Sequence, residues 1–470
     1  MARAARRLAL PACALLAAAC GPPRPDILLL SLDTLRRDAV GVYAPGRPSS
    51  TPNLDAFAAG AVRFARAFVP LPFTLPSHMS LFTGVHPDVH GVWHRHARLS
   101  PRLQTLPERL RGAGYATLGV VTNAWMKEEY GFGRGFDHYE RLEPGSFYAE
   151  RVNQRALELL DGRGDDPRPV FLFLHYLDAH SDWQILPYDS PPRFQAGLDL
   201  ARAEREFCAP EAGSCATRFL LRADRARQEL PPALLAKLHA LYGRGVRYLD
   251  DELGRLFAAL DARGFLDPAL VVVSSDHGEE FREHGRFGHA QTYDETIAVP
   301  LLIRFPRGRH AGRVVEEVVE TLDLLPTLAD TLGLPPPEPA QGESLLPLLR
   351  GSGPAAAFAL SRDKDVRTRY ALRTGGFKLI YDPASASAEL YDLANDPGET
   401  RNRAGEDPAR VEALGRQLEG LVRANAELAR GFPALESAES VLSPEEEQQL
   451  QEIGYLEEPA AGAAAPGGAP

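Results

Sequence analysis

Short, uninterrupted apolar runs recur along the chain, each bounded by polar or turn-forming residues. Apolar runs without alternation are typical of strands that are covered on both faces, as in a mainly parallel sheet. Helical patterns separate the runs, and the longest covers Ala233–Leu260, where leucine and valine recur every three or four residues. The alternation predicts an α/β fold with a doubly wound, mainly parallel sheet and helices on both faces. The expected strands are Ile27–Leu32, Ala116–Val121, Val170–Tyr176, Leu270–Ser274 and Val299–Phe305.

The pattern changes after about Leu349. GSGPAAA indicates a linker, ALRTGGFKLIYD and AELYDLANDPGETRNRA predict strands joined by turns, and a charged helix is expected at about Pro408–Ala429. We therefore expect a main α/β domain at 26–350 and a small C-terminal α+β subdomain at 351–456. The low-complexity segment 457–470 is expected to be a disordered tail.

The N-terminus has the pattern of an export signal. A positively charged MARAARR precedes the apolar LALPACALLAAA, which is too short to span a bilayer, so residues 1–20 are interpreted as a signal peptide. Leu16–Cys20 (LAAAC) resembles a bacterial lipobox, in which the cysteine is lipidated, although Ala17 stands where leucine is usual. An ordinary signal peptide with a chance cysteine is the alternative. The expected location is the bacterial cell envelope, on the periplasmic face, with a lipid anchor in the membrane at Cys20.

Charge and cysteine content bear on the partners of the protein and on the compartment in which it works. The net charge is −11 and the sequence has no basic run, which excludes a nucleic-acid partner. With Cys13 lost in the signal and Cys20 lipidated, Cys208 and Cys215 remain, seven positions apart in FCAPEAGSC. They could close a small disulfide in an oxidising compartment, or stay as two surface thiols.

Acidic and imidazole side chains follow several of the predicted strands. Ligands bind beyond the carboxyl ends of strands in open α/β sheets, so these side chains are expected in one crevice. Asp33 and Asp276 could each be a helix N-cap when taken alone. Clustered carboxylates and imidazoles favour a bound cation, and Asp33, Asp276 and His277 are the expected ligands, with one position left for a hydroxyl. Asp178 and His180 follow a further strand.

Thr74, in PFTLPSHMSLFTG, is the candidate for that position. It stands at a predicted helix start, where free backbone N–H groups and the helix dipole favour an anion. A metal-bound threonine hydroxyl loses its proton more readily and becomes a nucleophile. From the residue types alone, a helix cap is an equal alternative.

Successive blocks of the sequence resemble the signature blocks of the sulfatase family, in the family's order, from about Asp26 to about Leu456. The family belongs to the alkaline-phosphatase-like superfamily. The resemblance implies a large α/β domain with a small C-terminal domain, and hydrolysis of sulfate or phosphate esters at a divalent metal. The blocks are SLDTLRRD, TPNLDAFAAGAVRFARAF, TLPSHMSLFTGVHPDVHGV, LHYLDAHSD, SSDHGEEFREHG and ELYDLANDPGETRN.

The resemblance also implies roles for single residues. Asp33 corresponds to the first metal ligand, and Asp276 with His277 to the family's Asp-Asn or Asp-His ligand pair. His180, in LDAH, matches a histidine that contacts the substrate's anionic group. His289, in RFGHAQTYDE, stands where many members place an anion-binding lysine. His78 or His289 could instead protonate the leaving group.

Three departures from the family pattern bear on the reaction. Thr74 and His78 hold the first and last places of the C/S-x-P-S-R block, and threonine cannot form the family's formylglycine aldehyde. Thr34 replaces the second metal aspartate. The usual G-K-W-H block is absent after GYATLGVV, where Asn123 is a partial substitute.

A metal-bound threonine nucleophile is implied by a similarity to lipoteichoic acid synthases and nucleotide pyrophosphatases/phosphodiesterases of the superfamily. The sequence thus predicts a hydrolase of sulfate or phosphate/phosphonate esters with one divalent metal (Ca²⁺, Mn²⁺ or Zn²⁺) and Thr74 as nucleophile. Its expected partner is a sulfated or phosphorylated small molecule or glycan. An envelope phosphotransferase and an inactive, glycan-binding sulfatase-like protein are the alternatives.

Overall fold

The computed structural model describes residues 24–143, 145, 147–181, 186–209, 214–351, 358–452 and 456. The predicted signal peptide with its lipobox (1–20) and the predicted tail (457–470) lie outside this range. Within it, no helix combines the length and apolar character needed to cross a bilayer.

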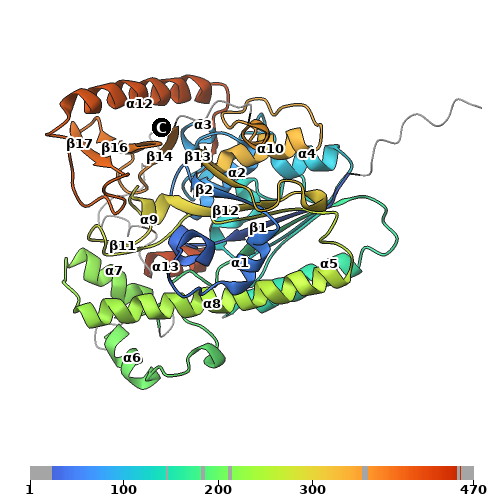
Figure 1. Cartoon of the computed structure of the whole chain (residues 1–470), viewed down its shortest axis with the longest axis horizontal. Coiled ribbons are helices and arrows are strands. Elements are labelled where there is room, and N and C mark those ends of the chain that lie inside the picture. The colour runs from blue at the N-terminus through green and yellow to red at the C-terminus, as the bar shows by residue number, and fades with distance from the viewer. Residues whose placement is uncertain are drawn as a thin grey trace, which may run out of the picture.

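One eight-stranded sheet forms the centre of the molecule (Figure 1). Its order is β13 (Val314–Glu320), β2 (Val62–Phe68), β12 (Ala298–Arg304), β9 (Leu270–Ser274), β1 (Ile27–Leu32), β6 (Val170–Tyr176), β4 (Ala116–Val121) and β5 (His138–Arg141). Every paired neighbour runs parallel except β12, which is antiparallel to both β9 and β2. The predicted mainly parallel α/β sheet is confirmed.

Helices cover both faces of this sheet, because both faces of its strands are apolar. In β1 the even and odd residues enter two separate cores: Ile27 and Leu29 pack on one side, and Leu28, Leu30 and Leu32 on the other. The first core is closed by α2 (Thr74–Thr83), α3 (Pro87–His90), α4 (Leu106–Gly112), α10 (Leu324–Thr331) and α11 (Leu346–Arg350). The second is closed by α1 (Pro52–Ala59), α5 (Tyr148–Asp161) and α8 (Pro232–Ala262).

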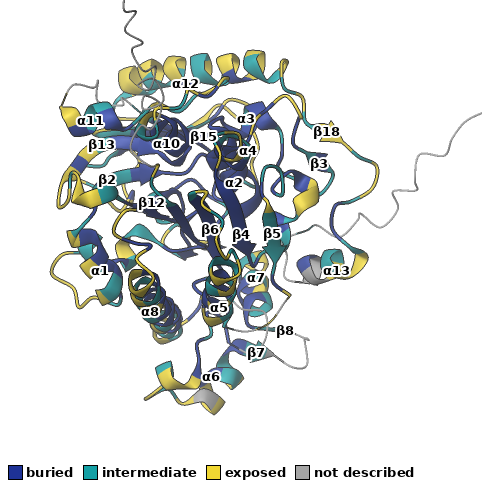
Figure 2. Cartoon of the chain, turned by 90° about the vertical axis from the view of Figure 1, so that its right-hand side faces the viewer, coloured by how far each residue is buried: buried dark blue, intermediate teal, exposed yellow. Residues whose placement is uncertain are grey.

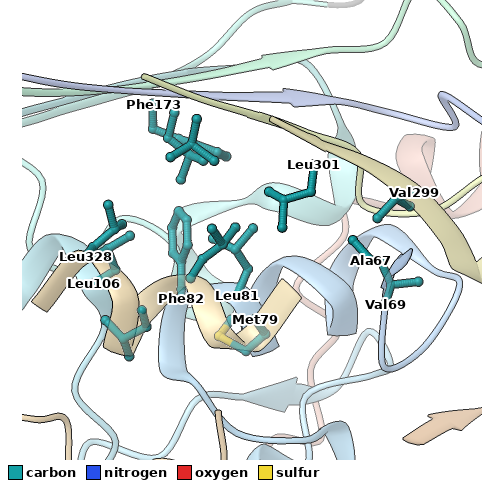
Figure 3. Close-up of a cluster of buried hydrophobic side chains, with 14 of the residues drawn as sticks. Ala67, Val69, Met79, Leu81, Phe82, Leu106, Phe173, Val299, Leu301 and Leu328 are labelled. Carbon is teal, nitrogen blue, oxygen red and sulfur yellow. The ribbon is translucent and has the colours of Figure 1, made fainter. Parts of the chain in front are cut away.

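The packing in the first core fixes the direction of α2. Met79, Leu81 and Phe82 of this helix point into the cluster that also contains Phe173 of β6 and Leu301 of β12 (Figure 3). All ten residues of α2 are buried. A helix buried on every side is held rigidly by its neighbours, and its first residue is therefore held in one place relative to the sheet.

The predicted elements are found with small differences. Four of the five predicted strands have the expected bounds, and the fifth is displaced by one residue, to Ala298–Arg304. The long helix at Ala233–Leu260 is confirmed as α8. Strands β2, β5 and β13 were not predicted, because charged residues interrupt their apolar positions; β2 reads VRFARAF.

The C-terminal subdomain contains a four-stranded antiparallel sheet and one long helix, as predicted. The sheet order is β14 (Phe358–Arg362), β15 (Tyr370–Thr374), β16 (Phe377–Asp382) and β17 (Ser387–Asp392). Helix α12 (Pro408–Ala429) packs on it through Leu418, which joins Leu360, Tyr370 and Leu372 in one buried cluster. Figure 2 shows α12 at the edge of the molecule, with its outward side exposed and the inner elements buried.

An excursion between β6 and α8 carries the two remaining cysteines. It contains α6 (Leu200–Phe207), β7 (Cys208–Ala209), β8 (Ser214–Cys215) and α7 (Thr217–Arg225). Cys208 and Cys215 form a disulfide, so the predicted pairing is confirmed and the alternative of two free thiols is wrong. The smaller elements are β3 (Ala97–Arg98), β10 (Glu280–Phe281), β11 (Phe287–Gly288), α9 (Asp294–Ile297), β18 (Leu435–Glu436) and α13 (Pro444–Glu452).

Candidate active site

Two neighbouring strands bring the predicted metal ligands together. Asp33 directly follows β1, and Asp276 and His277 follow the adjacent parallel strand β9. All three side chains are buried, and one ligand atom of each lies within 4.8 Å of the others. Neither carboxylate begins a regular α-helix, so the helix-cap interpretation of Asp33 and Asp276 is wrong.

The donor atoms of this cluster fit a divalent cation. His277 Nε2 lies 3.7 Å from Asp33 Oδ1 and 3.5 Å from Asp276 Oδ2. Within the described chain, none of these three buried atoms has a hydrogen-bond partner. His277 Nδ1 donates to the carbonyl oxygen of Gly278 at 3.0 Å, which leaves the lone pair on Nε2. Two carboxylate oxygens and one imidazole nitrogen that are buried without partners are a typical ligand set for Mn²⁺, Zn²⁺ or Ca²⁺.

The charges of the cluster follow from its burial. Burial and the nearby charge of Asp33 raise the pKa of Asp276 to about 6. Burial also acts to raise the pKa of Asp33, but hydrogen bonding to His175 and the surrounding imidazoles hold it below its usual range. Burial lowers the pKa of His277 to about 4, so the ring is neutral at pH 7 and able to bind a metal.

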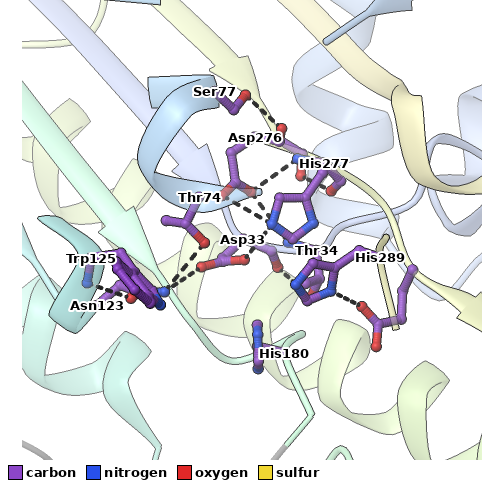
Figure 4. Close-up of polar contacts among 12 residues, drawn as sticks. Asp33, Thr34, Thr74, Ser77, Asn123, Trp125, His180, Asp276, His277 and His289 are labelled. Atoms are coloured by element: carbon purple, nitrogen blue, oxygen red, sulfur yellow. Dashed lines mark hydrogen bonds and ion pairs between the residues drawn. The ribbon is translucent and has the colours of Figure 1, made fainter. Parts of the chain in front are cut away.

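Thr74 lies at the edge of this cluster (Figure 4). It is the first residue of α2, the N-cap position belongs to Phe73, and the hydroxyl group of Thr74 is 3.4 Å from Asn123 Nδ2. The same nitrogen donates to Asp33 Oδ2 at 3.1 Å. The helix-cap interpretation of Thr74 is therefore wrong, and its hydroxyl group instead belongs to the polar cluster at the strand ends.

His78 lies one turn further along α2 and is completely buried. Its Nδ1 is 2.8 Å from the carbonyl oxygen of Thr74, and its Nε2 is 2.8 Å from Ser31 Oγ. Both ring nitrogens therefore have hydrogen-bond partners inside the protein. Asp276 Oδ2 also lies 3.6 Å from Nδ1. The ring connects the backbone of Thr74 to β1.

His180 and His289 lie together on another side of the cluster. Their ring centres are 5.5 Å apart, and the His289 ring stacks on the ligand His277 with centres 4.1 Å apart. His289 Nδ1 is 2.8 Å from Glu279 Oε2, and Tyr188 donates to the other oxygen of Glu279 at 2.6 Å. These contacts fix the orientation of the His289 ring.

Two site residues were not found from the sequence. His175 is the sixth residue of β6, where its Nε2 lies 3.2 Å from Asp33 Oδ2 and its Nδ1 2.9 Å from Thr122 Oγ1. Its only signal was a single imidazole in the otherwise apolar VFLFLHY, which has no distinctive spacing. Glu279, two residues after His277, reads from the sequence as one of several carboxylates in HGEEFREH.

Asp178 does not contribute to the metal-ligand cluster. It accepts hydrogen bonds from the backbone amides of Tyr148 and Ala149, in the first turn of α5, and its burial raises its pKa to about 7. The prediction that grouped it with the crevice residues is wrong, because β6 is followed by a turn that directs Asp178 toward the α5 side of the sheet.

Comparisons with known proteins agree with this geometry. The sulfatase family matches residues 25–334, and the C-terminal domain of N-sulphoglucosamine sulphohydrolase matches residues 282–424. Human arylsulfatase A is 30% identical, with 87% of this chain and 89% of the relative covered. An N-acetylglucosamine-6-O-sulfatase of Bacteroides thetaiotaomicron is 25% identical over 84% and 86% of the two chains.

Solved structures show the same fold. A phosphonate monoester hydrolase of Agrobacterium radiobacter superposes with a TM-score of 0.68 at 24% identity, and covers 86% of this chain and 96% of its own. A protein solved with its substrate D-glucosamine-2-N,6-O-disulfate superposes with a TM-score of 0.67 at 22% identity, over 87% and 98% of the two chains.

The chain belongs to the sulfatase family, within the alkaline-phosphatase-like superfamily. It is a sulfatase-like ester hydrolase of a metal-dependent family, and Asp33, Asp276 and His277 form a group able to hold the metal. The predicted family, fold and enzyme class are confirmed.

Proposed function

We propose that this protein is an exported, metal-dependent hydrolase that uses the hydroxyl group of Thr74 as its nucleophile and acts on phosphate or phosphonate esters in preference to sulfate esters. The observation that carries the proposal is the position of Thr74 at the start of a fully buried helix, within hydrogen-bond distance of Asn123, which also binds Asp33. Asn123 thereby links the hydroxyl group of Thr74 to Asp33 of the metal-ligand cluster.

Asp33, Asp276 and His277 would hold one divalent cation, with the Thr74 hydroxyl as a further ligand. When bound, Ca²⁺, Mn²⁺ or Zn²⁺ would lower the pKa of this hydroxyl and offset the negative charge of the substrate. The N-terminus of α2 acts in the same direction, since its backbone N–H groups and dipole favour an anion beside Thr74.

In the first step, Thr74 Oγ1 forms a bond to phosphorus as the bond to the leaving-group oxygen breaks. Asn123 donates its amide hydrogen to Thr74 Oγ1 and stabilises negative charge there as the hydroxyl proton passes to solvent. His180 gives a proton to the departing oxygen. His78 holds the Thr74 backbone in place through the contact between its Nδ1 and the Thr74 carbonyl oxygen.

In the second step, water attacks the phosphorus of the phosphorylated or phosphonylated threonine, and Thr74 Oγ1 leaves and regains a proton. His289 accepts the proton of the water through Nε2, because its Nδ1 hydrogen is directed to Glu279. His289 and Glu279 therefore resemble a general base and the carboxylate that orients it.

For a threonine nucleophile, phosphorus is a better centre of attack than sulfur. A formylglycine hydrate releases sulfate by collapsing to its aldehyde, and threonine has no such route. A phosphothreonine or phosphonothreonine ester is open to in-line attack by water at phosphorus with electrostatic stabilisation. The phosphonate monoester hydrolase among the structural neighbours supports this choice for the fold, and the sulfatase relatives are the reason to keep sulfate esters in the test.

Export is part of the proposal. The Cys208–Cys215 disulfide supports an oxidising compartment, and the N-terminal sequence supports lipidation of Cys20 in the cell envelope. Full-length protein with Cys20→Ala is expected in the soluble fraction of the cell envelope instead of the membrane fraction. An unchanged distribution would overturn the anchor.

The activity is tested with p-nitrophenyl phosphate, bis-p-nitrophenyl phosphate, p-nitrophenyl phenylphosphonate and p-nitrophenyl sulfate, each with added Mn²⁺, Zn²⁺ or Ca²⁺. The expected result is a higher kcat/KM for a phosphorus ester than for the sulfate, lost in Thr74→Ala and in Asp276→Ala. Faster turnover of the sulfate would overturn the preference for phosphorus. Binding without turnover of any ester would favour a binding protein.

A further inference from the structure

The turn that follows β1 carries a strained residue next to a metal ligand. Thr34 has a backbone φ of +57°, in the left-handed region that β-branched side chains rarely adopt. It is completely buried, and it directly follows Asp33. A residue stays in such a conformation only where its surroundings hold it there, so the contacts of this turn bear on the position of the Asp33 carboxylate.

The backbone of this turn is connected to the turn after β9. The Thr34 amide donates to Asp276 Oδ1 at 3.4 Å. The next amide, of Leu35, donates to Ser275 Oγ at 3.1 Å, and this hydroxyl group donates to the carbonyl oxygen of His277 at 2.6 Å. A change in the conformation of Thr34 would therefore move the two ligand-bearing turns relative to each other.

The side chain of Thr34 has a different contact. Its hydroxyl group donates to the carbonyl oxygen of Asp33 at 2.7 Å. Thr34 stands where the family pattern has its second metal aspartate, but this hydroxyl group is used inside the turn. The contribution of Thr34 to the site is therefore made by its backbone.

Tyr242 of α8 makes two hydrogen bonds to the same turn. Its hydroxyl group donates to the carbonyl oxygen of Thr34 and accepts from the amide of Arg36, both at 2.9 Å. The ring is buried and packs edge-on against Tyr188 and Phe281, with ring centres 5.5 Å and 5.2 Å apart. Because the ring is held by these neighbours and by a long helix, its hydroxyl group has a fixed position.

We propose that Tyr242 is a positioning residue for the metal: its hydroxyl group holds the Thr34 peptide in the left-handed conformation, so that Asp33 and Asp276 are preorganised before a cation binds. This inference rests on the metal site of the proposed function and does not depend on which oxygen is the nucleophile. Ligands that are ordered in advance cost less to order on binding, and loss of a supporting hydrogen bond weakens metal binding.

Helix α8 offers a matched control in Tyr248. Its hydroxyl group donates to the carbonyl oxygen of Phe147 at 3.3 Å and accepts from the amide of Glu150 at 3.4 Å. Phe147 also has a left-handed backbone, with φ of +56°. The two tyrosines therefore make the same kind of contact, but Tyr248 makes it at the start of α5 and not beside a metal ligand. In both cases, phenylalanine removes only the hydroxyl group.

The test is calorimetric titration of Mn²⁺ into the metal-free, full-length protein and its variants. Tyr242→Phe is expected to weaken binding about 10-fold or more, and Tyr248→Phe by less than about threefold. Thr34→Gly removes the steric reason for the turn to leave the left-handed conformation, since glycine adopts it readily. In a Thr34→Gly background, Tyr242→Phe is therefore expected to weaken binding by less than about threefold. A tyrosine that only filled the core would cause the same loss in both backgrounds.

Equal affinities of wild type and Tyr242→Phe, or equal losses in the two backgrounds, would overturn the proposal. A wild type that binds none of Mn²⁺, Zn²⁺ and Ca²⁺ contradicts the metal site of the proposed function, and the same variants are then compared by urea unfolding without metal. If Tyr242→Phe shifts the unfolding midpoint less in the Thr34→Gly background than in wild type, the role of Tyr242 in holding the turn is supported. Equal shifts overturn that role.

Discussion

The side-chain amide of Asn123 donates to the hydroxyl oxygen of Thr74 across 3.4 Å. The family's usual lysine and histidine near the nucleophile are absent here, and Asn123 lies in the segment where they would be expected. Its second contact, to Asp33 at 3.1 Å, connects the hydroxyl group to the metal-ligand cluster. One neutral amide thus orients both the nucleophile and a carboxylate.

Replacing Asn123 with alanine is expected to lower kcat by about 10- to 100-fold, because a hydrogen bond to a developing alkoxide is lost. KM is expected to change little, since the amide contacts the enzyme's own nucleophile. The measurement is steady-state kinetics on p-nitrophenyl phenylphosphonate. Asn395→Ala, in the C-terminal subdomain, is the control, and an Asn123→Ala enzyme with normal kcat would contradict the role.

His175 is expected to control metal affinity. His175→Gln removes the imidazole that lies 3.2 Å from Asp33 Oδ2, so the carboxylate loses the ring that orients it. Affinity for Mn²⁺ or Zn²⁺ should fall about 10- to 100-fold by calorimetric titration. His138→Gln, on a partly exposed pair with Glu140, serves as the comparison. Equal metal affinities of the two variants would show that His175 does not act through Asp33.

The sequence was most informative where a residue follows a strongly apolar strand. Asp33, Asp276 and His277 could be grouped in advance because β1 and β9 have clear apolar patterns and parallel strands end at the same edge. His175 could not be grouped with them, since it lies inside a strand and its partner Asp33 is 142 positions away (175 − 33).

The central sheet likewise contains strands that the sequence predicts and features that it does not predict. Buried strands were predicted almost to the residue, because continuous apolarity is a local signal. The reversed direction of β12 and the strands β2 and β13 at one edge of the sheet depend on long-range pairing, and their charged residues hide the pattern.

Stability is expected to depend on pH through Asp178. Burial raises the pKa of Asp178 to about 7 in the folded state, whereas in the unfolded chain the side chain titrates near its ordinary pKa of 3.8. Between these values the folded protein holds a proton that the unfolded chain has released, so stability is highest below about pH 4 for this group and falls as the pH rises toward 7. Asp178→Asn should remove roughly 2–4 kcal/mol of that decline, as measured by urea unfolding at pH 5 and pH 8. Parallel pH profiles of variant and wild type would contradict this assignment.

As a nucleophile, the Thr74 oxygen is expected to form a covalent bond to the phosphorus of the substrate. The most direct measurement is mass spectrometry of peptides from enzyme quenched in acid during turnover of p-nitrophenyl phenylphosphonate. We expect a phenylphosphonyl group on Thr74, and loss of both the adduct and turnover in Thr74→Ala. A Thr74→Ala enzyme with wild-type turnover, or an adduct on a different residue, would contradict it.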